Sequence, residues 1–323
     1  MVSNNQRITL VCAGDDNFSI PLAVSLFSAL KNLTPCSEVQ VYILDCGISP
    51  QNKNNIERVL GSTGQRLLLE WVSSDMSRYE CFVNTKWLNA TAYGRLTIAD
   101  RLPRQITKVI YLDSDLIVYG DLRELWQLPL DGYALLAARD YKIPYVSSPS
   151  GLVDTYRLLG LKPDTPYLNS GLMVIDLERW RKEKTSDKIF SYLEQYKDTL
   201  RYADQDGLNA VLCNDWIELD PKWNVQAHAA RYCQEWPASE FKEKMLPQMP
   251  DLMRHPNVLH FTGTKKPWNS GLRSSTTHHF HNHLKSSKWF NPLGYILWRL
   301  KWLMISIKLI CENTSYWVRM TDE

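Results

Sequence analysis

The stretch Val109-Ile110-Tyr111-Leu112-Asp113-Ser114-Asp115 decides how the fold is interpreted. Four consecutive apolar residues are typical of a strand buried on both faces, and two carboxylates follow at its carboxyl end. In an open α/β sheet, ligands bind at the carboxyl ends of the strands. Two acids separated by one residue can present oxygen ligands to one divalent cation, which can clamp nucleotide phosphates. We therefore interpret Asp113 and Asp115 as a metal and diphosphate site. The alternative for Asp113-Ser114-Asp115 is an ordinary solvated turn.

Short apolar runs alternate with helical patterns through the first half of the chain. Apolar residues recur at steps of three or four within Pro21 to Leu33, which predicts a helix with one face packed on a sheet. A second helix is predicted over Asn52 to Leu60, and strands over Ile8 to Ala13, Val39 to Leu44 and Leu67 to Val72. This alternation predicts an α/β fold with a Rossmann-like, mainly parallel sheet flanked by helices.

The alternation continues into the second half. We expect helices over Tyr93 to Leu102 and Leu177 to Leu200, a third that opens at Asp204, and strands over Tyr133 to Ala138 and within Asn169 to Asp176. The first of these strands runs into Arg139-Asp140, so Asp140 is a further carboxylate at a strand end. The acids at the start of the third helix suit the helix dipole.

Composition excludes several classes of protein. The 323 residues carry a net charge of +2, which gives no global electrostatic case for binding nucleic acid. Seven cysteines without a Cys-x-x-Cys pair indicate reduced thiols and a cytosolic compartment. The apolar run near the amino terminus is too short for a signal peptide, so we do not expect export.

The predicted first strand ends at Ala13-Gly14-Asp15-Asp16-Asn17. Its small residues permit close backbone approach, and its polar side chains can hydrogen-bond a base and a ribose. The chain has no Gly-x-Gly-x-x-Gly and no Walker sequence, which argues against a nicotinamide oxidoreductase and a P-loop nucleotidase. Asp15 and Asn17 also suit an ordinary turn.

A histidine is placed at another predicted strand end by Val258-Leu259-His260, and a glycine turn with Lys265 and Lys266 follows. The histidine can supply a third metal ligand, and the lysines can supply charge to a phosphate. Mixed carboxylate and imidazole ligands suit Mn²⁺ better than Ca²⁺. The alternative for His260 is a hydrogen-bonded core residue.

Six motifs, in this order, resemble the retaining glycosyltransferases of family 8, specifically bacterial galactosyl- and glucosyltransferases that build lipopolysaccharide or lipooligosaccharide cores. They begin at Ala13, Ala92, Tyr111, Leu168, Asp204 and His260 and run to Phe18, Leu96, Asp115, Gly171, Asp206 and Trp268. The resemblance implies a GT-A type fold with one catalytic domain over residues 1–283. It also implies transfer of a hexose, galactose or glucose, from a UDP-sugar to a saccharide acceptor.

The resemblance also implies roles for individual residues. The nucleotide would contact Ala13, Asp15, Asn17, Gly263 and Lys266, and Mn²⁺ or another divalent cation such as Mg²⁺ would bind Asp113, Asp115 and His260. The donor sugar would contact Arg95, Asp140 and Asn169, with Asp204 and Gln205 at the reacting centre. Retention of configuration leaves two routes open: double displacement, or same-face attack in which the Gln205 amide oxygen steadies positive charge.

Residues 284–323 form a basic, aromatic tail. From Lys285 to Ile310 there are five basic residues and no acidic one, interleaved with tryptophans. Arg299, Lys301 and Lys308 interrupt the apolar stretch, and each would cost about 3 kcal/mol near a bilayer centre. Peripheral attachment to an anionic membrane is therefore favoured over a span, with packing on the catalytic domain as the alternative. The preceding histidines (278, 279, 281 and 283) match no zinc spacing, so we expect an exposed connector.

The sequence thus predicts a UDP-hexose transferase at the cytoplasmic face of the membrane, acting on a lipid-linked saccharide or glycolipid and not on nucleic acid. Two alternatives stay open. One is a self-glycosylating initiator resembling glycogenin, which the same family resemblance permits. The other is a membrane-bound sensor that binds a sugar nucleotide without transferring the sugar.

Overall fold

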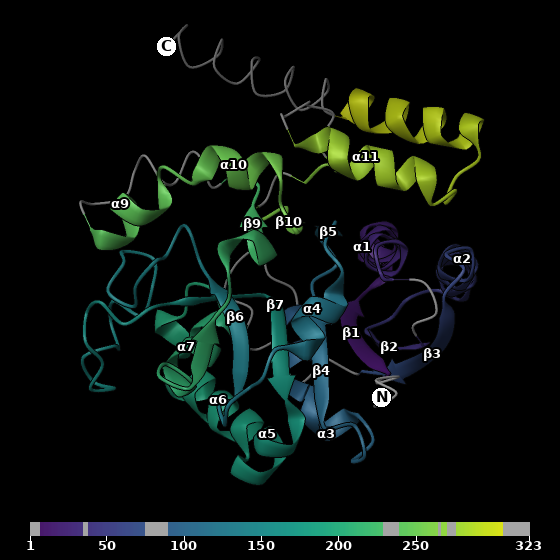
Figure 1. The fold of residues 1–323 in the computed structure, drawn as a ribbon. Helices are drawn as coiled ribbons and strands as arrows, with labels where there is room; N and C mark the ends of the chain where they lie inside the picture. Colours follow the sequence, from purple (N-terminus) through teal and green to yellow (C-terminus); the bar gives the residue numbers. More distant parts are fainter. Residues whose placement is uncertain are drawn as a thin grey trace, which may run out of the picture.

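A central sheet of seven strands organises the part of the chain that the structure describes (Figure 1). The structure is a computed structural model, and it describes residues 7–34, 38–74, 90–228, 239–263, 266–269 and 276–305. The strands are β1 (Ile8–Gly14), β2 (Glu38–Asp45), β3 (Arg66–Ser73), β4 (Lys108–Leu112), β6 (Leu135–Arg139), β7 (Leu168–Asp176) and β8 (Trp216–Glu218), in the order β3-β2-β1-β4-β7-β6-β8. Only β7 runs against its neighbours β4 and β6, while the other pairs are parallel. The predicted α/β class with a mainly parallel sheet is confirmed.

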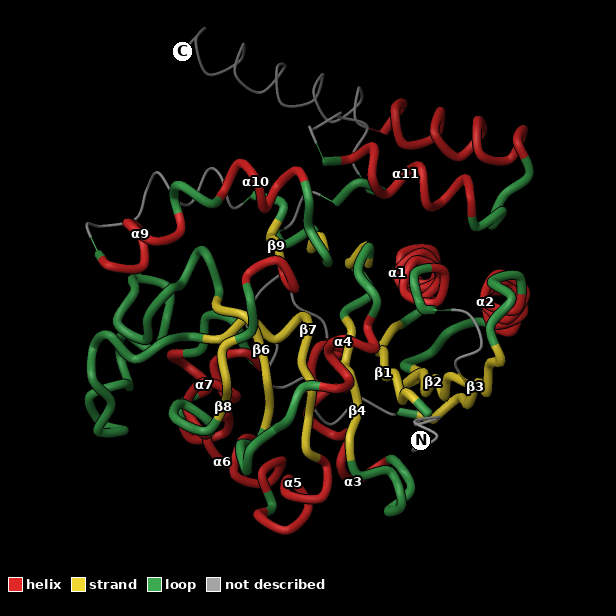
Figure 2. The backbone as a smooth tube through the Cα atoms, viewed as in Figure 1, coloured by secondary structure: helices red, strands yellow, loops and turns green. Residues whose placement is uncertain are grey.

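Successive side chains of β1 enter two different hydrophobic clusters. Leu10 and Cys12 pack with α1 (Ser19–Lys31) and α2 (Pro50–Gly61) on one face of the sheet. Val11 and Ala13 pack on the other face with helices from later in the chain, α3 (Ile98–Arg101), α5 (Leu177–Glu183), α6 (Thr185–Gln195) and α7 (Asp204–Val211). Because strand side chains alternate between faces, a fully buried strand requires cover on both sides. Figure 2 shows this arrangement, with the helices on either side of the strands.

Two predicted helices differ from those observed. The single helix predicted over Leu177 to Leu200 is divided into α5 and α6 at Lys184, whose φ of 52° is left-handed. The N–H of Lys184 bonds the carbonyls of Trp180 and Arg181, which ends α5 with a C-cap. The helix predicted over Tyr93 to Leu102 is instead a 3₁₀ segment, η3 (Ala90–Thr97), followed by the short α3.

A small second sheet brings distant residues together. It consists of β5 (Leu116–Val118), β10 (Val258–His260) and β9 (Val225–Gln226). Strand β5 begins directly after Asp115 and runs antiparallel to β10, so that Leu116 is opposite His260. The N–H of Phe261 donates to the carbonyl of Asp115 over 3.0 Å. This pairing places His260 beside the acids that follow β4, although about half of the chain separates them in sequence.

The prediction that the histidines at 278, 279, 281 and 283 form an exposed connector is wrong. These residues belong to a packed helix, α11 (Thr277–Ser286). Phe280 and Leu284 are buried in the same cluster as α1, since α11 carries apolar residues at helical spacing. Trp289 is buried there too, and Arg58 donates to its carbonyl over 3.2 Å. The division of the chain at residues 283 and 284 stays a prediction.

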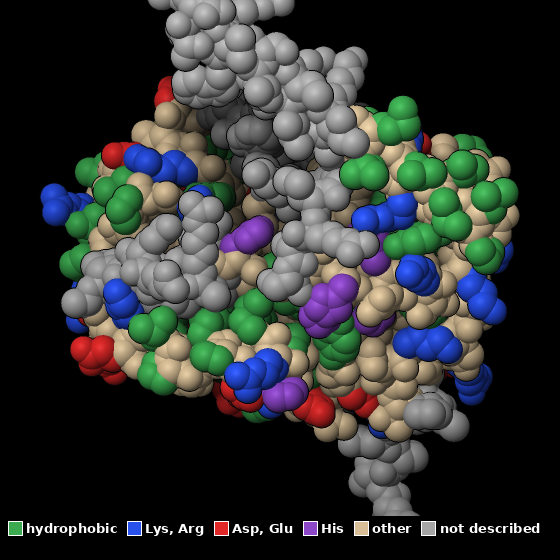
Figure 3. All heavy atoms as spheres, turned by 90° about the horizontal axis from the view of Figure 1, so that it is seen from above, with side chains coloured by type: hydrophobic (Ala, Val, Ile, Leu, Met, Phe, Trp, Pro, Cys, Tyr) green, Lys and Arg blue, Asp and Glu red, His purple; other side chains and the backbone are tan. Residues whose placement is uncertain are grey.

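Residues 292–305 form a further helix with two unlike faces. Tyr295 and Trp298 pack against the buried cluster, and Arg299 lies 2.5 Å from a ring nitrogen of His281. Apolar side chains at helical spacing are exposed on the other side: Leu293, Ile296, Leu297, Leu300, Leu303 and Met304. Seen from above, hydrophobic side chains gather toward the right, close to lysine and arginine side chains (Figure 3). Over the described residues, no helix is both long and apolar enough to cross a bilayer.

Two further helices, α9 (Glu240–Met245) and α10 (Met249–Arg254), pack as a separate small cluster with Tyr141 and Val225. They follow the short η5 (Pro221–Asn224) and β9, and precede β10. Helix α9 contacts the carboxyl end of β6. The guanidinium group of Arg139, the last residue of β6, lies 4.5 Å from the ring of Phe241 in α9.

Candidate active site

The acids after β4 are held between the neighbouring strands. The N–H of Asp113 donates to the carbonyl of Gly171 on β7 over 2.8 Å. The hydroxyl of Ser114 donates to the carbonyl of Ala13 on β1, also over 2.8 Å. Ser114 therefore points into the sheet, and the acid on each side of it faces the cleft beyond the strand ends. The local structure thus fixes both carboxylates relative to the sheet.

Asp113, Asp115 and His260 converge as the sequence predicted. Nε2 of His260 lies 3.1 Å from Oδ1 of Asp115 and 3.9 Å from Oδ2 of Asp113. One ligand atom from each residue lies within 4.8 Å of the others. Two carboxylate oxygens and one imidazole nitrogen fit a divalent cation such as Mn²⁺ or Mg²⁺. The three residues therefore form a candidate metal site.

Glycine at position 171 makes room for the imidazole. A Cβ added there would lie 2.3 Å from Cε1 of His260, closer than any real Cβ contact. No other residue type fits without moving the ring. The ring consequently packs directly on the backbone of β7, and β7 fixes its distance from the two acids.

A buried arginine links the acids of two elements. Nη2 of Arg95 lies 2.8 Å from Oδ1 of Asp113, and its Nε lies 3.0 Å from Oδ2 of Asp204 at the start of α7. Its Nη1 also donates to the hydroxyl and the carbonyl of Ser170, over 2.7 and 2.9 Å. Burial favours neutral Arg95, but the two carboxylates outweigh this and raise its pKa. Arg95 therefore stays charged and fastens α7 to the strand ends.

The carboxylates differ in their affinity for protons. Burial raises the pKa of Asp113, and burial raises that of Asp204 to about 6, with Arg95 opposing both shifts. Burial raises the pKa of Asp115, but Lys266 and His260 together outweigh burial and hold this pKa well below its usual range. Asp115 is thus the more strongly ionised of the two carboxylates predicted to bind the metal.

Hydrogen bonds join the predicted sugar-binding residues into one network. Oδ2 of Asp140 accepts from Nδ2 of Asn169 over 2.9 Å and from Nε2 of Gln205 over 3.1 Å. Its Oδ1 accepts from the backbone N–H groups of Lys142 and Ile143. Oε1 of Gln205 in turn accepts from the N–H of Ser170. Four donors occupy Asp140, so its carboxylate has a fixed orientation.

Donors for an anion lie on the side of β10. Lys266 Nζ is 2.5 Å from Oδ2 of Asp115 and 2.6 Å from the carbonyl of Phe261. Gly263 adopts a φ of 87°, which favours glycine. Oγ1 of Thr262 is buried and has no hydrogen-bond partner among the described residues. Lys265, which the sequence also predicted to supply charge to a phosphate, lies outside the described residues.

Ten of the thirteen predicted site residues line one cleft of about 210 Å³: Arg95, Asp113, Asp115, Asp140, Asn169, Asp204, Gln205, His260, Gly263 and Lys266. The other three lie outside this lining: Ala13 is near the end of β1, and Asp15 and Asn17 follow that strand. Asp15 caps η1 (Asp16–Phe18) by accepting from the N–H of Phe18, and Asn17 is exposed. Their proposed contact with a nucleotide stays a prediction.

Sequence reasoning missed four residues that the cleft depends on. Ser170, Thr262 and Gln226 line it, and Asn224 lies behind His260 and Asn169. Ser170 and Thr262 fall inside quoted motifs, so their place next to assigned residues was a usable signal. Nothing in the pattern around Asn224 or Gln226 indicates a site.

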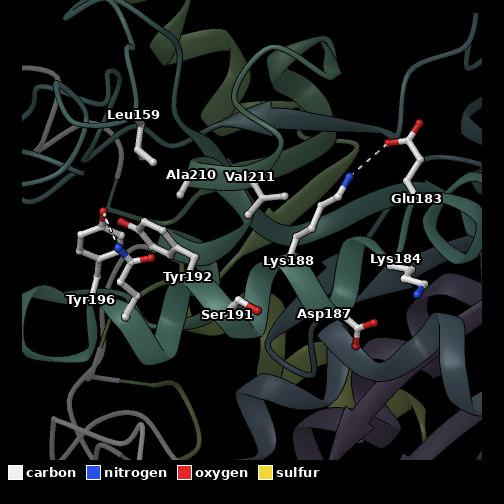
Figure 4. Close-up of a pocket in the computed structure, with 11 residues that line it drawn as sticks. Leu159, Glu183, Lys184, Asp187, Lys188, Ser191, Tyr192, Tyr196, Ala210 and Val211 are labelled. Atoms are coloured by element: carbon white, nitrogen blue, oxygen red, sulfur yellow. Dashed lines mark hydrogen bonds and ion pairs between the residues drawn. The ribbon is translucent and has the colours of Figure 1, made fainter.

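A second hollow lies away from this cleft, along α6 and α7 (Figure 4). It measures about 520 Å³ and is lined in part by Tyr192, Tyr196 and Val211. None of its lining residues is shared with the cleft at the strand ends. The second hollow contains none of the predicted site residues.

A protein-family model described as glycosyl transferase family 8 matches residues 9–271. The chain belongs to glycosyltransferase family 8. The matched range contains every residue that lines the strand-end cleft. As a family 8 member, the chain is a glycosyltransferase, and its GT-A type architecture follows from the fold described above.

Individual relatives agree with this family 8 assignment. General stress protein A of Bacillus subtilis is 30% identical over 288 residues, covering 88% of this chain and 95% of that protein. A lipopolysaccharide 1,2-glucosyltransferase of Escherichia coli K12 is 24% identical over 289 residues, covering 89% and 80%. The structure of galactosyltransferase LgtC with donor and acceptor sugar analogs matches with a TM-score of 0.73 and 25% identity, covering 86% of this chain and 96% of LgtC.

Proposed function

We propose that this glycosyltransferase transfers galactose or glucose from a UDP-sugar to a saccharide acceptor with retention of configuration. The observation that carries the proposal is the convergence of Asp113, Asp115 and His260 beside the ammonium group of Lys266. A metal ligand set next to a cation suits a diphosphate, which needs both. The similarity to a lipopolysaccharide glucosyltransferase and to LgtC supports a hexose donor and a glycan acceptor.

The proposed roles follow from the positions of the residues. Asp15 and Asn17 would contact the uridine with Ala13, because they follow β1 at the same edge of the sheet. Lys266 and Gly263 would contact the diphosphate, and the unpartnered hydroxyl of Thr262 is in reach of the same group. Arg95, Asp140 and Asn169 would position the donor sugar, directly or by holding its neighbours.

Catalysis would depend mainly on stabilising the leaving group. The bond from the anomeric carbon to the diphosphate would break, and the acceptor hydroxyl would form the new bond and pass its proton to an oxygen of the departing diphosphate. A divalent cation bound by the three ligands would neutralise charge on the departing diphosphate. Lys266, which lies beside Asp115, would turn from this carboxylate to the phosphate and add a second positive charge there.

Gln205 and Asp204 would act at the sugar. The amide of Gln205 is held by Asp140 and by the N–H of Ser170, so it is rigidly placed in the cleft. An amide is a poor nucleophile, but its oxygen can steady positive charge on the reacting carbon during same-face attack. Asp204 is tied to Arg95 and would hold sugar hydroxyls. Double displacement remains the alternative route.

We further propose that the carboxyl-terminal region attaches the enzyme to the cytoplasmic face of an anionic membrane, where a lipid-linked acceptor would lie. The exposed apolar side of the 292–305 helix supports this, since Leu293, Leu297 and Met304 are 65%, 58% and 70% exposed. Lysine at position 301 is exposed on the same helix. Apolar side chains next to cations suit a peripheral helix on an anionic leaflet.

The deciding experiment measures UDP release from a panel of UDP-sugars, with Mn²⁺ and a mixed oligosaccharide acceptor pool. Release with one sugar, above a control without acceptor, is the expected result and names the donor. A gain in intact mass on incubation with a UDP-sugar would favour the self-glycosylating alternative. Binding of a UDP-sugar without release, in the presence of acceptors, would favour the sensor.

A further inference from the structure

We infer that Asn224 is a positioning residue that sets the tautomer of His260 and ties the proposed metal ligands to the proposed sugar-binding residues. The inference rests on the proposed function of those residues. Asn224 ends η5, and its side chain is fully buried. Its Nδ2 donates to Oδ1 of Asn169 over 2.8 Å, and its Oδ1 lies 3.0 Å from Nδ1 of His260. One amide therefore contacts both halves of the site.

The direction of these hydrogen bonds follows from the groups at the far end. The carboxylate of Asp140 already receives two backbone N–H groups and acts only as an acceptor, so Asn169 must turn Nδ2 toward it. The N–H of Gly171 can only donate, and it lies 3.1 Å from Oδ1 of Asn169. Two independent neighbours thus fix the amide of Asn169 in the same orientation.

The orientation then passes through Asn224 to the imidazole. Because Oδ1 of Asn169 is an acceptor, Asn224 must present its Nδ2 there and its Oδ1 to His260. An oxygen opposite Nδ1 requires that this nitrogen carry a proton. Neutral imidazole has one N–H, so Nε2 keeps its lone pair. Nε2 is also the nitrogen that faces Asp115, which is the atom a cation would need.

Steric contacts prevent the His260 ring from rotating away from Asn224. Gly171 packs against Cε1 and Nδ1 of His260, and an added Cβ would lie 2.3 and 2.7 Å from those atoms. The backbone of His260 is held in β10, where its carbonyl accepts from the N–H of Ala227 over 2.7 Å. The ring is clamped between Gly171 and Asn224, so it cannot exchange its two nitrogens by rotation.

Two substitutions of Asn224 can distinguish its contact with His260 from its contact with Asn169. In Asn224→Asp a carboxylate can still accept from Nδ1 of His260, but it cannot donate to Asn169. In Asn224→Ala both contacts are lost. Ion affinity should therefore be lost in the second variant and kept in the first, while donor binding should weaken in both.

The test combines three measurements on the full chain. Calorimetry gives the Mn²⁺ affinity without nucleotide, and ¹⁵N-histidine NMR under alkaline conditions reports which ring nitrogen of His260 is protonated, with His260→Gln to assign the signal. Steady-state kinetics gives the KM for the UDP-sugar. We expect Asn224→Ala to lower Mn²⁺ affinity by about 10-fold or more and to mix the tautomers. We expect Asn224→Asp to keep the Mn²⁺ affinity and the His260 tautomer near those of the wild type, and to raise the KM for the UDP-sugar.

Asn32→Asp is the matched control, since the amide of Asn32 donates to the carbonyls of Ser28 and Val118 away from the cleft. It should lower stability without changing Mn²⁺ affinity. Unchanged Mn²⁺ affinity and tautomer in Asn224→Ala would overturn the inference. An equal loss of Mn²⁺ affinity in both Asn224 variants would also overturn it, because it would indicate a packing role alone. Wild-type protein that binds no Mn²⁺ would instead contradict the proposed metal dependence, and the NMR measurement would still decide the tautomer.

Discussion

The ammonium group of Lys266 lies 2.5 Å from Oδ2 of Asp115, so a cation of the chain is bound to a carboxylate that we assign to a metal ion. Oδ1 of the same carboxylate faces His260. Two cations attracted to one carboxylate compete for it. A diphosphate would relieve this competition by accepting Lys266, so ion and nucleotide should assist each other.

Replacing Lys266 should therefore change ion and nucleotide binding in opposite directions. In Lys266→Met, Mn²⁺ should bind the nucleotide-free protein several-fold more tightly, because a competing charge is gone. UDP should bind about 10-fold more weakly, because a charged hydrogen bond is lost. Calorimetric titrations with each ligand check this. Lys188→Met, which removes an exposed lysine 4.0 Å from Glu183, is the control. Weaker binding of both ligands would contradict the competition.

Asp115→Asn should remove a charged metal ligand while keeping the size of the side chain. Mn²⁺ affinity and turnover should each fall by about 10-fold or more, since a neutral amide is a poorer ligand for a hard cation. Asp154→Asn makes the same change in an exposed ion pair with Arg201 and should leave both values unchanged. If the Asp115 variant kept wild-type affinity and turnover, the metal assignment would be wrong.

Gly171→Ala should disturb the site through sterics alone. The added methyl group has no room beside His260, so the ring must move or the strand must shift. We expect the free energy of unfolding to fall by about 1–3 kcal/mol, together with lower Mn²⁺ affinity. Urea unfolding and calorimetry measure the two effects. Gly61→Ala, where nothing lies within 4 Å of an added Cβ, is the control. Equal behaviour of the two variants would argue against the close packing.

Asp204 should make stability depend on pH in a defined direction. Its pKa is about 6 in the fold against an ordinary 3.8, so the fold favours the protonated acid. The resulting stabilisation is complete below the ordinary pKa and is lost as pH rises through about 6. Asp204→Asn mimics the neutral acid and should gain up to about 3 kcal/mol relative to wild type between pH 4 and pH 7. Urea unfolding across this range checks it, and a constant difference would contradict the shift.

The exposed side of the 292–305 helix should be needed for vesicle binding. Leu297→Glu or Leu300→Glu puts a negative charge on this side, so sedimentation with anionic vesicles should fall by about 10-fold, with UDP release in solution unchanged. Leu158→Glu is the control, because Leu158 is 73% exposed elsewhere on the chain. Wild-type sedimentation of the helix variants would contradict membrane attachment.

The first half of the fold could be predicted because its strands are short, mostly apolar runs that alternate with helical patterns. Asp113, Asp115 and His260 were found for the same reason, since each follows or ends such a run. Their convergence depends on β5, which at three residues is too short to recognise by pattern. The strand-end position of His260 suggested a third metal ligand, and the family resemblance assigned it to the same ion as the two acids.

Other features depend on contacts that no local pattern records. Lys184 adopts a left-handed conformation that the helical pattern of the sequence does not indicate, so the break between α5 and α6 was not predicted. Asn224 resembles a turn residue after a tryptophan, and only its burial between Asn169 and His260 gives it a role. Residues of this kind support a site without belonging to a motif.

The pairing of β5 with β10 also bears on synthesis of the chain. The ribosome makes Asp113 and Asp115 well before His260, because 144 residues lie between Asp115 and His260 in the sequence. A nascent chain therefore carries the two acids without their imidazole partner while these intervening residues are added. Any benefit that the ion gives to folding is postponed until β10 docks beside β5, so ion capture follows that pairing.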